Sequence, residues 1–104
     1  MKKLILQTNK ACYFCGKRDG LHLHEIMFGT ANRKKSIQYG LQVWLCPAHH
    51  NMSSQGVHLN REKDLELKRM AQKRFEELYS HEDFMKIFHH NYLEGDKKDG
   101  NSSN

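Results

Sequence analysis

The chain has 104 residues, with 17 Lys and Arg against 12 Asp and Glu and a formal net charge of +5. This length suits one domain with a modest core, which a metal or disulfides often reinforce. The sequence has no apolar run of the ~20 residues that a membrane helix needs, so we expect no membrane partner. Residues 1–7 lack the long apolar region and cleavage site of a secretion signal, and we therefore expect a cytoplasmic protein.

Positive charge gathers in the first part of the chain. Residues 1–60 carry eight Lys and Arg against two acids, whereas residues 61–104 carry nine against ten. A basic half suggests a polyanionic partner such as a nucleic acid. The simpler interpretation is that the surplus lysines only aid solubility.

The first half of the chain predicts a knuckle, two strands and a short helix. Residues 11–17 form a tight turn that contains two cysteines and a glycine. Alternating apolar residues predict a strand at 21–26 and a second strand at 41–45. We expect residues 29–40 between them to form a basic loop. A proline then predicts the start of a short helix over residues 47–51.

The second half predicts two helices. Asn60 is a typical N-cap for a long helix with acidic residues in its first turn. Apolar residues at helical spacing predict its buried stripe: Leu67, Ala71, Phe75 and Leu78. Ser80 predicts the cap of a further helix, whose apolar positions are Phe84, Ile87 and Phe88. The order of elements predicts an α+β fold in one domain over residues 1–93, with a disordered tail at 94–104.

Three cysteines and a histidine have the spacing of a zinc site. Cys12 and Cys15 form one pair, and Cys46 with His49 forms another pair with the same two-residue gap. Zinc prefers such pairs on two separate turns, and an odd number of cysteines argues against a disulfide framework. His50, which follows directly, is an alternative fourth ligand. The cysteines could instead be buried, unreactive thiols, or the first two could form a redox pair.

A second group of metal-binding residues remains after the zinc ligands are assigned. It contains His24, Glu25, His50 and His58, which fall on the first strand, the short helix and the segment after it. Such a group can hold one divalent ion, and a nearby imidazole can deprotonate a water molecule for attack on a phosphodiester. His22 shares a strand face with His24, but we interpret it as an ordinary exposed residue.

Here the chain resembles the HNH, or ββα-metal, nucleases, and specifically their small zinc-stapled phage and prophage members. The resemblance covers residues 12–58. It is carried by Cys12-x-x-Cys15, by Leu23-His24-Glu25-Ile26 and by Leu45-Cys46-Pro47-Ala48-His49-His50. It implies a zinc-stapled hairpin and helix as the motif core, to which residues 60–93 add a helical extension.

The resemblance also implies roles for individual residues. His24 matches the position of a catalytic metal ligand, Glu25 the position of the general base, and His50 the closing ligand of the catalytic metal. Cys46 and His49 match the second zinc pair. The segment after the motif resembles an additional element of the phage subgroup, in which His58 is a further candidate ligand.

The sequence departs from the family pattern at two places. Glu25 stands where the family has a histidine base, so His24 is an alternative base and His22 is then available for another role. The asparagine in the middle of the family motif is missing from its usual position before the second strand. Asn32 and Asn51 are the candidates to replace it.

The resemblance implies a metal-dependent endonuclease that hydrolyses phosphodiester bonds in DNA. Its cofactors would be a structural Zn²⁺ and a catalytic Mg²⁺, Mn²⁺, Ni²⁺ or Zn²⁺. We expect Arg33, Lys34 and Lys35 to contact phosphates. Phage recombination or packaging proteins are candidate partners, and the enzyme would act as a monomer or a homodimer. The alternative function is a non-catalytic module, similar to a zinc ribbon, that binds nucleic acid or protein.

Overall fold

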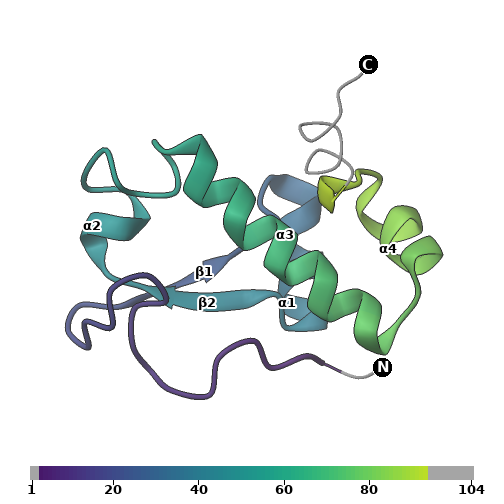
Figure 1. Ribbon diagram of the computed structural model, residues 1–104, viewed down its shortest axis with the longest axis horizontal. Coiled ribbons are helices and arrows are strands. Elements are labelled where there is room, and N and C mark those ends of the chain that lie inside the picture. Colours follow the sequence, from purple (N-terminus) through teal and green to yellow (C-terminus); the bar gives the residue numbers. More distant parts are fainter. Residues whose placement is uncertain (1–2, 94–104) are drawn as a thin grey trace.

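The computed structural model describes residues 3–93, so the expected tail at 94–104 lies outside the described residues. The elements in chain order are β1 (His22–Glu25), α1 (Thr30–Tyr39), β2 (Gln42–Leu45), α2 (Pro47–His50), α3 (Arg61–Leu78) and α4 (His81–Phe88). Figure 1 shows α2 at one end of the two-stranded hairpin and α1 at the other, with α3 as the longest helix. The coarse expectation of a small mixed α/β protein with a two-stranded antiparallel sheet is confirmed.

The register of the hairpin decides which side chains meet α3. His22 lies opposite Leu45, and His24 lies opposite Val43. Side chains at directly opposed positions share one face of a sheet. Val43, Leu45 and His24 are all at most 3% exposed, and the two apolar residues join the core that α3 completes. The inner face of the sheet therefore carries both core residues and a buried histidine.

The expectation of a basic loop at residues 29–40 is wrong, because this segment forms helix α1. The helix ends at Tyr39 and is capped by Gly40, which has a φ of 77° and donates its N–H to the carbonyls of Ser36 and Ile37. A Cβ at Gly40 would collide with the carbonyl oxygen of Leu4, so only glycine fits this close approach. The helix then turns directly into β2.

Helix α1 has no apolar stripe, which is why the sequence pattern did not predict it. Its buried residues are Ser36 and Tyr39, whereas Ile37 is 43% exposed. The hydroxyl of Ser36 donates to the carbonyl of Met27 and accepts from its backbone N–H, both at 2.9 Å. A buried polar anchor of this kind fixes the helix without the periodicity that a sequence pattern needs.

The predicted caps of the two C-terminal helices are confirmed. Asn60 accepts a hydrogen bond from the backbone N–H of Lys63 at 3.1 Å and begins α3. Ser80 and Asp83 form a reciprocal capping box at the start of α4. Each such side chain satisfies backbone N–H groups that lack a partner inside the helix.

The predicted stripe of α3 is confirmed except at its last member. Leu67, Ala71 and Phe75 are fully buried, but Leu78 is 46% exposed. Tyr79, the next residue, instead stacks on Phe75 with 4.7 Å between the ring centroids. The helix ends at Leu78, so its final side chain turns away from the core that Tyr79 then covers.

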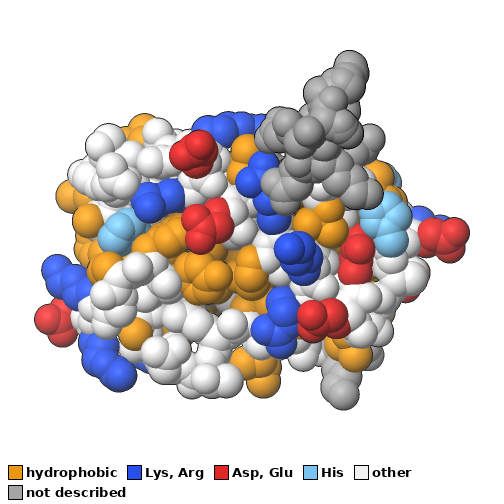
Figure 2. Space-filling model, viewed as in Figure 1, with side chains coloured by type: hydrophobic (Ala, Val, Ile, Leu, Met, Phe, Trp, Pro, Cys, Tyr) orange, Lys and Arg blue, Asp and Glu red, His pale blue; other side chains and the backbone are white. Residues whose placement is uncertain are grey.

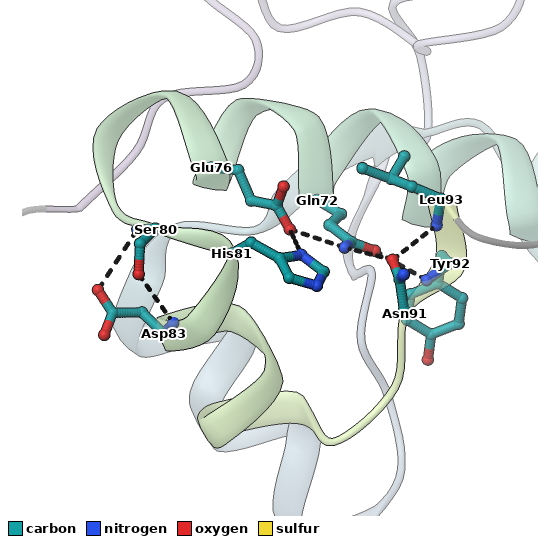
Figure 3. Close-up of polar contacts among 8 residues, drawn as sticks. All are labelled: Gln72, Glu76, Ser80, His81, Asp83, Asn91, Tyr92 and Leu93. Atoms are coloured by element: carbon teal, nitrogen blue, oxygen red, sulfur yellow. Dashed lines mark hydrogen bonds and ion pairs between the residues drawn. The ribbon is translucent and has the colours of Figure 1, made fainter.

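The last described residues are tied to α3 through one buried amide. Gln72 is fully buried, donates to Asn91 and Glu76, and accepts from the backbone N–H of Tyr92 at 2.8 Å (Figure 3). Asn91 also accepts from the backbone N–H of Leu93. These bonds hold the segment after α4 against the middle of α3.

Of the helices in residues 3–93, not one has both the length and the apolar character that a bilayer crossing requires.

Candidate metal centres

The first candidate centre begins with the knuckle that carries Cys12 and Cys15. The backbone N–H of Cys12 donates to the carbonyl of Lys17, and the N–H of Gly16 donates to the carbonyl of Cys12, both at 2.8 Å. Gly16 has a φ of 81°, a conformation that L side chains rarely adopt. The turn therefore folds the two thiols toward one another.

The second pair of ligands comes from the start of α2. Cys46 is the N-cap of this helix, and Pro47 occupies its first turn. The N–H of His49 donates to the carbonyl of Cys46 at 3.0 Å, which brings the imidazole back toward that thiol. The N–H of Tyr13 donates to the carbonyl of Trp44, so the knuckle is also bonded to the strand that leads into α2.

The distances among these four groups match a tetrahedral metal site. At the usual zinc bond lengths, two thiolates lie about 3.8 Å apart, and a thiolate and an imidazole nitrogen lie about 3.6 Å apart. The Sγ atoms of Cys15 and Cys46 are separated by 3.8 Å. The Nδ1 atom of His49 lies 3.6 Å from Cys12 Sγ and 3.4 Å from Cys46 Sγ. The four residues can therefore hold one metal ion.

The backbone around Cys12 favours its thiolate. Burial opposes ionisation of this thiol, but backbone N–H groups of Cys46, Cys15 and Phe14 donate to its sulfur and lower its pKa below the usual value. The thiolate is the form of cysteine that binds metals.

The second candidate centre consists of three imidazoles. Its members are His24 on β1, His50 at the end of α2, and His58 in the following loop, with one ligand atom each within 4.8 Å of the others. The Nε2 atoms of His50 and His58 are 3.2 Å apart. Two imidazole nitrogens on one tetrahedral zinc ion lie about 3.3 Å apart, so this spacing suits a shared ion.

His24 is the buried member of this group, at 3% exposed. Its Nε2 atom has no hydrogen-bond partner among the described residues, although burial normally demands one. Burial, and after it the nearby His50, His58 and Lys68, lower the pKa of His24 to about 3. The ring is therefore neutral at physiological pH and offers the lone pair that a metal needs.

The structure separates the two adjacent histidines that the sequence left ambiguous. His49 lies with the three cysteines, whereas His50 lies with His24 and His58. The backbone N–H of His58 donates to the carbonyl of His50 at 3.3 Å, which folds the loop back onto α2. The backbone N–H of Val57 likewise donates to the carbonyl of His49 at 2.9 Å. The loop thus delivers His58 to the side of His50.

The structure does not bring Glu25 into the histidine group. Glu25 follows His24 on a strand, so its side chain points to the opposite face of the hairpin. Its carboxylate lies 3.5 Å from the guanidinium of Arg33 and accepts a 3.5 Å hydrogen bond from Gln42, its cross-strand neighbour. The predicted base therefore contacts Arg33 and Gln42 on the face of the hairpin that is opposite to His24.

The three predicted phosphate-binding residues have different environments. Lys35 donates to the carbonyl of Ile87 at 2.6 Å and so joins α1 to the end of α4. Arg33 pairs with Glu25, although its side chain is still 66% exposed. Lys34 is exposed on α1. Only part of this basic run is therefore available to an outside partner.

Sequence reasoning set His22 aside as an ordinary exposed residue and missed two further neighbours of the histidine group. His22 places its Nδ1 atom 2.9 Å from Nδ1 of His50, and the i, i+2 spacing from His24 was the available signal. Phe28 packs on the rings of His24 and His58. Lys68, with an 8% exposed side chain, lies over Phe28. No pattern in the sequence marks these last two.

A cavity of about 600 Å³ lies along α3, but no residue of either centre lines it. Its walls are Glu62, Glu66, Arg69, Met70, Lys73, Arg74 and Glu77. Figure 2 shows acidic and basic side chains interspersed over this face rather than gathered by sign. The candidate metal ligands of both centres therefore lie outside this cavity.

Searches of family models, characterised proteins and solved structures find no match to this chain. The function is therefore inferred from the geometry of the two centres and from the motif resemblance.

Proposed function

We propose that the protein is a metal-dependent endonuclease of the HNH type that hydrolyses phosphodiester bonds in DNA. One observation carries the proposal: His24, His50 and His58 converge beside a second, separate group of three cysteines and a histidine. The cysteine-containing group would hold a structural Zn²⁺, and the three imidazoles would hold the catalytic divalent ion.

The donor set of the histidine group suits phosphate chemistry. Imidazole binds a metal as a neutral ligand, so a divalent ion held by three of them would keep its full positive charge. Such an ion supplies Lewis-acid stabilisation to the negative charge that develops on a phosphodiester during hydrolysis. The Nε2 atom of His24, which has no hydrogen-bond partner within residues 3–93, is the observation that best fits a ligand site, because a buried imidazole nitrogen is rarely left unsatisfied.

The accessibility of the group suits a polymeric substrate. His58 is exposed and His50 is half-buried, so solvent reaches two of the three ligands. His24 is the buried member of the group. A DNA backbone approaches from the surface and needs no deep pocket. The excess of basic residues in the first 60 positions would favour its approach.

The proposal places Lys34 and Arg33 as candidate phosphate contacts and leaves Lys35 with its structural bond to α4. Glu25 is not assigned as the general base in this proposal, because its carboxylate lies on the opposite face of the hairpin from His24 and contacts Arg33 and Gln42. A monomer would nick one strand and a homodimer would cut both. Phage recombination or packaging proteins remain the proposed partners.

A plasmid-cleavage assay tests the proposal. Purified protein is incubated with supercoiled plasmid and Mg²⁺, Mn²⁺, Co²⁺ or Ni²⁺, in parallel with His24→Ala, His50→Ala and the control His81→Ala. We expect metal-dependent nicking or linearisation that falls by at least about 100-fold in the two site variants, because loss of a ligand exceeds the usual effect of losing an outer partner. His81→Ala should cleave like the wild type, because His81 lies on α4 and bonds to Glu76.

Metal analysis of the same samples separates the two centres. The zinc of the cysteine-containing group should remain at one ion per chain in all three variants. Full activity in both site variants would show that the histidine group is not catalytic. Zinc-loaded protein that binds DNA but cleaves it with none of these metals would instead support the non-catalytic binding module.

A further inference from the structure

The two ring nitrogens of His50 face two different histidines. Its Nε2 atom lies 3.2 Å from Nε2 of His58, on the side of the three-histidine group. Its Nδ1 atom lies 2.9 Å from Nδ1 of His22, which is exposed on β1. Both distances fit a hydrogen bond, and the longer distance to His58 also matches two ligands of one ion.

A neutral imidazole has one N–H group and one lone pair, so these two contacts require different roles of the two nitrogens. If Nε2 of His50 gives its lone pair to a metal, Nδ1 must carry the proton and needs an acceptor. A ligating histidine usually donates this N–H to a carboxylate, a carbonyl or a water molecule. Nδ1 of His22 is the acceptor at this place.

We propose that His22 is a positioning residue, which accepts the Nδ1–H of His50 and so holds the tautomer and orientation that present Nε2 of His50 to a metal. This inference rests on the metal site in the proposed function and adds an outer partner that the motif does not include. His22 would bind no metal itself.

The hairpin gives His22 the fixed position that such a role needs. It is paired with Leu45, which is fully buried and directly precedes Cys46 at the start of α2. It lies on the same face of β1 as His24, because residues two apart in a strand point the same way. The rings of His22 and His50 meet nearly edge-on, at 73° and 5.0 Å between centroids. The contact therefore connects β1 to the end of α2.

A cobalt titration of variants at His22 tests the inference. Protein carrying zinc in the cysteine-containing group is titrated with Co²⁺, whose visible spectrum reports the second site. We expect His22→Phe, which keeps a ring but has no acceptor, to weaken Co²⁺ binding by about 10- to 100-fold with an unchanged spectral shape. His22→Asn places an amide oxygen near the position of Nδ1 and should restore the affinity to within a few-fold. His81→Phe is the matched control and should bind Co²⁺ like the wild type.

Each other outcome overturns a defined statement. An unchanged affinity in His22→Phe, or no recovery in His22→Asn, would overturn the positioning role while leaving the metal site intact. A changed spectral shape in His22→Phe would show that His22 is itself a metal ligand, and this result would also overturn the positioning role. Wild-type protein that binds zinc but no Co²⁺ would overturn the second metal site and this inference with it. Zinc content and circular dichroism confirm that every variant is folded.

Discussion

Gly56 shows how a single residue keeps the histidine group together. It is buried in the loop between His50 and His58, at a point where this loop crosses back over α2. A Cβ at this position would lie 2.8 Å from the carbonyl oxygen of His50, which is the same oxygen that accepts from the backbone N–H of His58. The absence of a side chain thus permits the close approach that brings two ligands to one place.

Replacing this glycine should disturb both stability and metal binding. We expect Gly56→Ala to lower the free energy of unfolding by about 1–3 kcal/mol, because backbone atoms would have to move apart. Co²⁺ affinity at the histidine group should fall at the same time. Ser54→Ala, an exposed change in the same loop, is the control and should alter neither quantity measurably. Denaturant unfolding with an unchanged midpoint in Gly56→Ala would show that the approach is looser than the structure indicates.

At the scale of elements, helix α2 serves both centres. Its N-cap is Cys46, and its last two residues are His49 and His50, which belong to different groups. The following loop bonds back to the carbonyls of both histidines. The orientation of His50 therefore depends on how firmly the first centre holds the start of this helix, whereas the first centre takes no ligand from β1.

This arrangement predicts a one-way dependence between the two metals. Removal of zinc by a chelator, or the change Cys15→Ser, should abolish Co²⁺ binding at the histidine group, because α2 loses the ion that fixes it. His24→Ala should empty the histidine group and leave the zinc in place. Metal content measured after dialysis distinguishes the two effects. Co²⁺ bound at the histidine group of zinc-free protein, with a spectrum that lacks the charge-transfer bands of Co²⁺ bound to cysteine thiolates, would contradict this dependence.

At the scale of the whole molecule, α3 connects the hairpin to the C-terminal part. Leu67 and Phe75 pack with the inner face of the sheet, and Phe75 also contacts the rings of Phe84 and Phe88 in α4. Aromatic contacts of this kind add about 0.5–1.5 kcal/mol each beyond burial. Gln72, on the same helix, holds the residues after α4.

The change Gln72→Leu tests this attachment. It leaves the backbone N–H of Tyr92 and the side chain of Asn91 without their buried partner, and we expect a loss of about 1–3 kcal/mol in the free energy of unfolding. Amide exchange at Tyr92 should become faster, while Co²⁺ affinity stays unchanged. Lys73→Met, an exposed neighbour on α3, should change stability by no more than about 0.5 kcal/mol. Unchanged exchange at Tyr92 in Gln72→Leu would contradict the role of this amide.

Local signals in the sequence determined much of the molecule. The paired spacing of Cys12, Cys15, Cys46 and His49 predicted a group that the structure assembles at metal-binding distances. The caps at Asn60 and Ser80 were predictable as well, because a capping residue acts on backbone groups within three positions of itself.

Only the tertiary structure decided how the remaining polar residues are distributed. Successive residues of a helix point about 100° apart, so His49 and His50 face different centres, and the sequence cannot say which. Strand alternation similarly turns Glu25 away from His24, and the hairpin register brings His22 to His50. Helix α1 could not be predicted because the buried hydroxyl of Ser36, rather than an apolar stripe, anchors it. Metal-ligand spacing and helix caps are short-range, whereas the shared surroundings of these histidines depend on elements that meet only in the folded chain.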